Sequence, residues 1–132
     1  MQFAGLNYLA VLVAAIAGFG FGAAWYTVLS KPWMDAVGLT EPPKPSPGPF
    51  IMAFACQLVM AWVLAGVIGH LGDVTVGRAI ISALFLWLGF IATTMIVNHR
   101  FQSASWSLTV IDAGHWLGVL LVMAVIIGLF GI

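Results

Sequence analysis

Long apolar runs separated by short polar segments make up most of the chain. Four runs are long enough to cross the ~30 Å hydrocarbon core of a bilayer as helices, which takes about 20 residues. They cover approximately residues 6–29, 50–71, 76–97 and 107–132. None alternates apolar and polar residues as the strand of a membrane barrel does. The pattern therefore predicts an all-α integral membrane protein.

The connecting segments predict how these helices are arranged. Segment 30–49 holds all six prolines, so its proline-rich end cannot be a regular helix. Residues 31–37 can form a short amphipathic turn at the membrane interface, which Gly38 would end. The other two connections, around residues 69–75 and 98–106, are short and favour antiparallel neighbours. We expect residues 1–132 to form one transmembrane domain, an up-down-up-down four-helix bundle with both termini on one side.

Composition supports a lipid environment and excludes several classes of function. The chain is 63% apolar and only 6% charged, and 132 residues cannot remove that much apolar surface from water. The formal net charge is zero and no basic stripe exists, so no nucleic-acid partner is expected. The lone Cys56 excludes a disulfide within the chain.

Positive charges give an expected orientation. Lys31, Lys44 and Arg100 belong to the first and third loops, whereas Arg78 lies on the other side. The positive-inside rule then places loops 30–49 and 98–106 in the cytoplasm and both termini outside, in a bacterial inner membrane. The first apolar run is too long for a secretory signal and lacks its positive flank, so we expect a retained span.

Small residues recur at four-residue spacing, which allows close approach of helix backbones. Their simplest use is packing within the chain. Because several spans carry them, the pattern also predicts a homo-oligomer. The helix-packing residues expected from this pattern are Ala14, Gly18, Gly22, Ala61, Ala65, Gly114 and Gly118.

Polar groups at membrane depth gather toward the side of the first and third loops. Because burying them in lipid is costly, they predict a one-sided polar pocket for a ligand or ion. Asp112 and His115 share a helix face and are its central candidates. Alternatively, Asp112 pairs with Arg100 or His115 only to anchor its helix, and the aromatic residues form an interfacial belt. The candidate residues are Trp25, Tyr26, Gln57, Asn98, His99, Arg100, Asp112 and His115.

Recognised catalytic and metal-binding motifs are missing from the sequence. No HExxH or cysteine-based zinc pattern occurs, and no nucleophile elbow, phosphate-binding loop or dinucleotide fingerprint is found. Two histidines and one aspartate could bind a metal only if separate helices matched in depth. We therefore expect no metal, no cofactor and no catalytic residue.

Several short motifs resemble those of a known family. They are Gly22-Ala23-Ala24-Trp25-Tyr26, Lys31-Pro32-Trp33-Met34 with Gly38, Leu86-Trp87-Leu88-Gly89-Phe90, and Asp112-Ala113-Gly114-His115-Trp116-Leu117. With them the chain resembles the domain-of-unknown-function 1761 family of small bacterial membrane proteins over nearly its whole length. The resemblance implies four spans and a membrane location, and it implies no activity.

Three functions from different classes fit the sequence. The first is a non-enzymatic membrane protein that self-associates or serves as an accessory subunit. The second is a small oligomeric channel or transporter, which the one-sided polar set would serve. The third is a membrane enzyme acting on a lipid-soluble substrate with His115 as acid or base, but no reacting partner can be placed for it. The sequence favours the first function.

Overall fold

The computed structural model describes residues 3–131, and all regular structure in this range is helical. The helices are α1 (Tyr8–Val28), α2 (Ser30–Val37), α3 (Pro47–His70), α4 (Val76–Leu86), the π-helical segment η1 (Trp87–Ala92), α5 (Thr93–Phe101) and α6 (Trp106–Phe130). Since α4, η1 and α5 are continuous, the chain has four helical segments long and apolar enough to cross a membrane. The predicted all-α membrane fold is confirmed.

Helix boundaries follow local chemistry. Asn7, Thr75 and Ser105 each accept a hydrogen bond from the backbone three residues onward and so cap α1, α4 and α6. Gly38 ends α2 in the left-handed conformation, with φ of 91°. The third span continues to residue 101, beyond the expected 97. The expected end of the fourth span at Ile132 lies outside the described residues.

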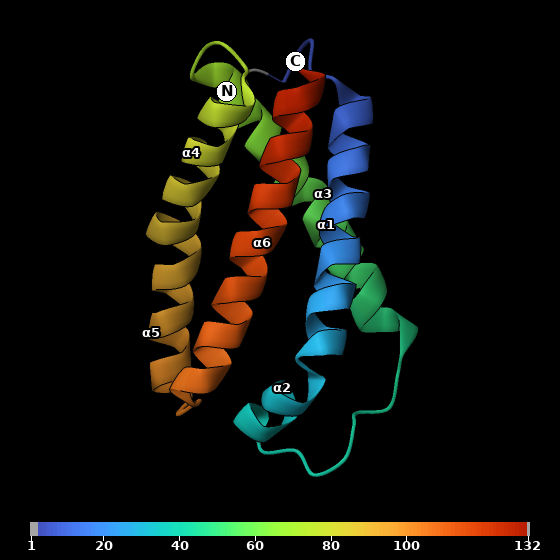
Figure 1. Cartoon of the computed structure of the whole chain (residues 1–132), viewed down its shortest axis with the longest axis vertical. Coiled ribbons are helices and arrows are strands. Elements are labelled where there is room, and N and C mark those ends of the chain that lie inside the picture. The colour runs from blue at the N-terminus through green and yellow to red at the C-terminus, as the bar shows by residue number, and fades with distance from the viewer. Residues whose placement is uncertain (1–2, 132) are drawn as a thin grey trace.

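The four spans alternate in direction, and both ends of the described chain lie on one side (Figure 1). We call this side the terminal side. The opposite side carries α2 and the turn before α6, and we call it the loop side. Helix α6 is central and packs mainly against α1 and α4. Helix α3 packs mainly on α1 and contacts α4 and α6 much less. The short α3–α4 connection therefore makes those helices antiparallel without making them close partners.

The apolar core occupies the terminal-side half of the bundle. Its fully buried members include Ile68 from α3, and Met123 and Ile127 from α6, packed around the small residues Ala14 and Ala15 of α1. Helices α4 and α6 approach closely at Gly128, where an added Cβ would lie 2.6 Å from the Cα of Val76. At the terminal-side end of the bundle, a cavity of about 430 Å³ is lined by Ala4, Gly5, Gly69, Gly72, Asp73, Val74 and Gly131.

The small residues singled out in the sequence face other helices of the same chain. Ala14, Gly18, Gly22, Ala61 and Ala65 are all buried. Gly114 lies against the Trp25 ring and Gly118 against the Phe21 ring, so a Cβ at either position would crowd that ring. These faces are used inside the bundle.

Candidate functional site

Two cavities lie toward the loop side, and Trp116 of α6 lines both. The α1–α3–α6 cavity has a volume of about 420 Å³, and the α3–α5–α6 cavity one of about 390 Å³. The first is lined by Phe19, Gly22, Ala23, Tyr26, Thr27, Phe50, Ala53, Gln57, His115 and Trp116. The second is lined by Met60, Phe90, Ile91, Thr94, Met95, Asn98, His99, Gln102 and Trp116.

The α1–α3–α6 cavity brings together the predicted Gln57 and His115. Their side chains are 3% and 5% exposed, respectively. Gln57 Oε1 and His115 Nδ1 have no hydrogen-bond partner within the described residues. A buried polar atom without a partner costs about 1–3 kcal/mol. Both atoms have almost no accessible surface, so they lie within the packed wall behind the cavity, and Arg100 Nε outside the cavity is a third buried atom without a partner in the described residues.

Two glycines of α1 make room for these polar side chains. A Cβ added at Gly18 would lie 3.0 Å from Gln57 Oε1, and one added at Gly22 would lie 2.6 Å from His115 Nε2. The glycines stand one helical turn apart on the same face of α1. The small-residue face of α1 that allows close helix packing thus also leaves space for the Gln57 amide and the His115 imidazole within the membrane-spanning region.

Tyr26 connects Asp112 to the same cavity. The Tyr26 hydroxyl donates a hydrogen bond of 2.7 Å to Asp112 Oδ1. The Tyr26 ring packs against the imidazole of His115, with centroids 4.8 Å apart. Neither Arg100 nor His115 binds Asp112 in the described part of the chain, where its hydrogen-bond partner is Tyr26. Asp112 thus lies behind Tyr26, which itself lines the cavity.

Arg100 and His99 belong to a separate cluster at the loop-side end. The Arg100 Nη2 donates to Thr109 Oγ1 at 2.7 Å, and His99 Nδ1 lies 2.8 Å from the same oxygen. The Arg100 guanidinium also donates to the carbonyls of Ala104 and Ser105 and stacks 3.6 Å from the Trp106 ring centroid. This arrangement holds the α5–α6 turn in place.

The family described as a protein of unknown function (DUF1761) matches residues 9–128. The chain belongs to the DUF1761 family. The resemblance drawn from its short motifs is therefore confirmed, and the matched region contains all residues that line both cavities. Searches of curated proteins and of solved structures gave no significant match.

Two tryptophans of this DUF1761 chain hold α6 on either side of Asp112. The Trp25 indole donates to the Ile111 carbonyl at 3.0 Å, and the Trp87 indole donates to the Ala113 carbonyl at 2.8 Å. Trp25 was expected at the site, whereas Trp87 was not. The signal for Trp87 was its depth, because it lies mid-span and cannot belong to an interfacial belt.

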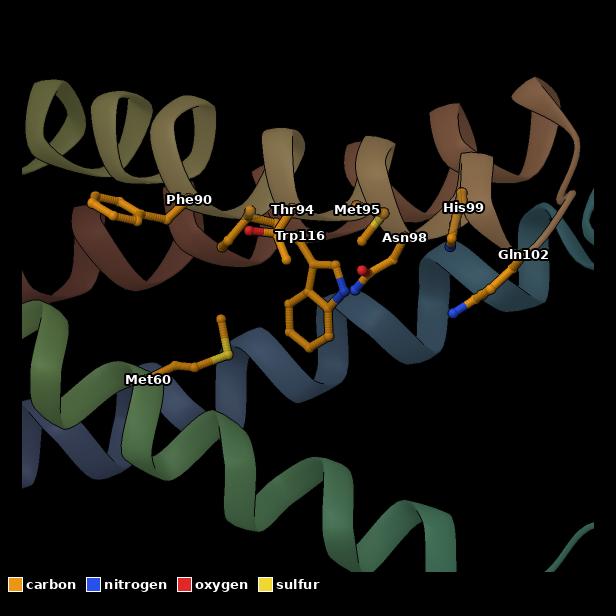
Figure 2. A pocket seen from close by; sticks show the side chains of 9 residues that line it. Met60, Phe90, Thr94, Met95, Asn98, His99, Gln102 and Trp116 are labelled. Atoms are coloured by element: carbon orange, nitrogen blue, oxygen red, sulfur yellow. The ribbon is translucent and has the colours of Figure 1, made fainter.

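Two of the residues predicted for the pocket, Asn98 and His99, line the α3–α5–α6 cavity. Figure 2 shows Met60 reaching from α3 toward the Trp116 ring, with Asn98 on the facing helix. Segment η1 contributes Phe90 to its wall, and π-helical turns often mark functional regions. This DUF1761 chain therefore distributes the predicted residues over two cavities and one loop cluster.

Thr109 is a buried polar residue of the loop-side cluster that was not among the residues predicted from the sequence. Its side chain is buried and contacts both His99 and Arg100. Thr109 lies three residues before Asp112 and so shares its helix face, which was the available signal. Within residues 3–131 of the DUF1761 chain, no three His, Cys, Asp or Glu side chains are placed to hold a metal ion.

Proposed function

We propose that the protein is a non-enzymatic membrane protein that binds a small amphipathic molecule in the α1–α3–α6 cavity. The observation that carries the proposal is that two polar side chains at membrane depth, those of Gln57 and His115, line one cavity. A ligand that hydrogen-bonds to the polar groups of these side chains would offset the cost of placing them in the membrane. Binding then gives a reason for their presence at membrane depth.

The cavity is suited to a molecule that arrives from the bilayer. Its volume of about 420 Å³ falls within the range of about 300–1,000 Å³ typical of small-molecule sites. Ala23, Thr27 and Phe50 line the cavity and are exposed, so its mouth faces lipid between α1 and α3. Such a site has a polar interior and an apolar entrance.

The packing of the terminal-side half supports a pocket over a channel. Leu64, Ile68, Val119, Met123 and Ile127 are buried there against small residues of neighbouring helices. A path for ions or solutes would have to pass through this apolar layer. The alternative of a small oligomeric channel therefore needs a conduit between copies of the chain.

Self-association stays a prediction. Because the small-residue faces are occupied within the chain, copies would meet on the span 76–101, the least buried of the four. A cysteine at the exposed Phe90 should then form a crosslink between copies in the membrane, whereas one at the exposed Leu9 should not. Equal crosslinking at both positions would argue against a specific contact.

We place the loop side in the cytoplasm, because Lys31, Lys44 and Arg100 lie there. In a variant with its native cysteine removed, a cysteine at Ser46 should react only with a membrane-permeant reagent in intact cells. Reaction with an impermeant reagent would reverse the orientation.

The binding proposal is tested by identifying what accompanies the protein. Wild type and the variant Gln57→Met should be isolated from the membrane in nanodiscs, and the bound small molecules extracted and weighed by mass spectrometry. We expect one species in about equimolar amount with wild type and its loss from Gln57→Met. The matched control is Thr93→Val, which removes an exposed hydroxyl outside both cavities. Identical extracts from all three proteins would contradict the proposal.

A further inference from the structure

We infer that the α3–α5–α6 cavity binds the acyl chain of an anionic membrane lipid, whose charged head lies at the loop-side end of the cavity. The site is separate from the α1–α3–α6 cavity and does not rest on the proposed function, although Trp116 lines both cavities. The inference follows from the length of the cavity, the order of its lining residues, and the donors and charge at one end.

The cavity is long in the direction in which the span crosses the membrane. Its lining on η1 and α5 begins at Phe90 and ends at Gln102, the residue that caps α5. At 1.5 Å per residue, this stretch rises about 18 Å. One leaflet contributes half of the ~30 Å hydrocarbon core, or about 15 Å. The lining therefore covers about the depth that one acyl chain reaches from the loop-side interface.

The lining residues of this span become more polar toward the loop side. They recur at intervals of about four residues and so share one helix face. In order toward the loop side, they are Phe90, Ile91, Thr94, Met95, Asn98, His99 and Gln102. Figure 2 shows Met60 of α3 and Trp116 of α6 across from this face. An apolar deep end and a polar interfacial end match the order of chain and head in a membrane lipid.

Two amide side chains at the loop-side end can reach the head of such a lipid. Asn98 and Gln102 line the cavity, are exposed, and form no side-chain hydrogen bond with another described residue. In Figure 2 both side chains extend from α5 toward the cavity. Each amide nitrogen can donate two hydrogen bonds. The pair can therefore bind the oxygens of a carboxylate or a phosphate.

A positive charge at the same end favours an anionic head. Arg100 follows His99 on α5, and both contact the Thr109 hydroxyl. The other hydrogen-bond partners of Arg100 are backbone carbonyls, so no carboxylate neutralises its charge within the described residues. Asp112 of α6 accepts its hydrogen bond from Tyr26 and does not line this cavity. A basic residue near a membrane surface attracts anionic lipids.

The main alternative is that interfacial water solvates the amides and bulk lipid covers the rest of the face without selectivity. The cavity volume of about 390 Å³ is far larger than the share of about 30 Å³ that one water has in the liquid. The side chains of its deeper wall, Met60, Phe90 and Ile91, are apolar and offer water no strong hydrogen bond. Methionine side chains adapt to the shape of a neighbour, so Met60 and Met95 suit a flexible acyl chain.

Probes with one chain length and different heads test the inference on wild-type protein in nonionic detergent micelles. They are hexadecanoic acid, hexadecyl phosphate and the hexadecyltrimethylammonium ion, and native mass spectrometry counts the bound molecules. We expect both anions to bind with one molecule per protein chain, and the cation to bind about tenfold more weakly because Arg100 repels it. Asn98→Leu should weaken binding of both anions about fivefold and leave binding of the cation unchanged.

Two tryptophan substitutions locate the site. Thr93 and Thr94 are adjacent and both exposed, but of the two only Thr94 lines the cavity. Thr94→Trp should fill the cavity and abolish binding of the anions, whereas Thr93→Trp should bind them as wild type does. Because Thr94 does not line the α1–α3–α6 cavity, this test is separate from that of the proposed function.

Dipalmitoylphosphatidic acid distinguishes two sources of the anionic head, and either result supports the inference. If it binds as well as the single-chain anions, the ligand is a phospholipid of the bilayer. If only the single-chain anions bind, the ligand is a free single-chain lipid such as a fatty acid. Equal binding of anions and cation to wild type would overturn the inference, because the head is then not recognised. Equal binding of the anions to Thr94→Trp and Thr93→Trp would also overturn it, because the lipid then lies outside this cavity.

Discussion

The terminal-side and loop-side halves of the bundle are made from the same four spans but are packed differently. On the terminal side, apolar side chains such as Ile68 and Met123 are fully buried against small residues. The terminal side has a cavity of about 430 Å³ at its end, between the loops. On the loop side, two cavities lie between the spans, and three buried polar atoms, Gln57 Oε1, Arg100 Nε and His115 Nδ1, have no partner in the described residues. Local departures from good packing are expected where a protein has a functional site. Under the proposed function, the terminal-side half mainly provides stability and the loop-side half provides the binding site.

Glycines show the same contrast at atomic scale. Gly128, on the terminal side, lies against the backbone of Val76, which cannot yield. Gly22, on the loop side, lies against the end of the His115 side chain, which can turn into a cavity. Gly20 has open space around its added Cβ. Replacing each of these glycines by alanine therefore adds the same methyl group in three environments: against a backbone, against a movable side chain and in open space.

The largest expected effect is at Gly128. Gly128→Ala should lower the free energy of unfolding by about 3 kcal/mol, because backbones would have to separate. Gly22→Ala should cost about 1 kcal/mol and also disturb ligand binding. Gly20→Ala should be neutral or stabilising by up to about 1 kcal/mol, since alanine favours the helix. Denaturation in mixed micelles measures all three, and an equal loss at Gly22 and Gly128 would remove the contrast.

The next effect concerns the hydrogen bond from Tyr26 to Asp112. Tyr26→Phe should cost about 1.5 kcal/mol, because a partly buried carboxylate loses its donor. Tyr8→Phe is the matched control, since its hydroxyl bonds the Phe3 carbonyl on a residue that is 56% exposed. We expect that control to change stability by less than about 0.5 kcal/mol. Equal costs in the same denaturation assay would mean that Asp112 finds another partner.

A smaller effect is expected at the tryptophans that hold α6. Trp25→Phe and Trp87→Phe should each cost about 0.6 kcal/mol, the average for a hydrogen bond between membrane helices. Trp62→Phe is the control, because the Trp62 ring packs on Phe3 and its indole forms no hydrogen bond in the described residues. A cost for Trp62→Phe equal to that of the other two would show that ring volume, and not the indole donor, is what matters.

The sequence was sufficient to predict the four spans, their alternating directions and the membrane location. These features depend on local properties, apolar length and connection length, which a single sequence contains. The central position of α6 could not be predicted from the sequence, because several of the spans carry a face of small residues that could pack against another helix. Which small-residue face packs against which helix depends on how the side chains of the two helices fit together in the folded structure.

The candidate site was predictable as a set of polar residues but not as a geometry. Gln57 and His115 were expected on one side of the membrane, and they line the same cavity. The partner of Asp112 could not be chosen, because Arg100 and His115 are near in sequence whereas Tyr26 is 86 residues away. Thr109 was overlooked because a threonine in a span has a simple alternative, bonding to its own helix.

The most direct test of the account is the stability of Gln57→Met without added ligand. Methionine keeps the length of glutamine and removes a buried acceptor that has no partner within the described residues. The free energy of unfolding should stay the same or rise by about 1 kcal/mol, while Thr93→Val leaves it unchanged. A loss of about 1 kcal/mol or more would show that the Gln57 amide is already satisfied as part of the fold. The loop-side half would then be structural, like the terminal half.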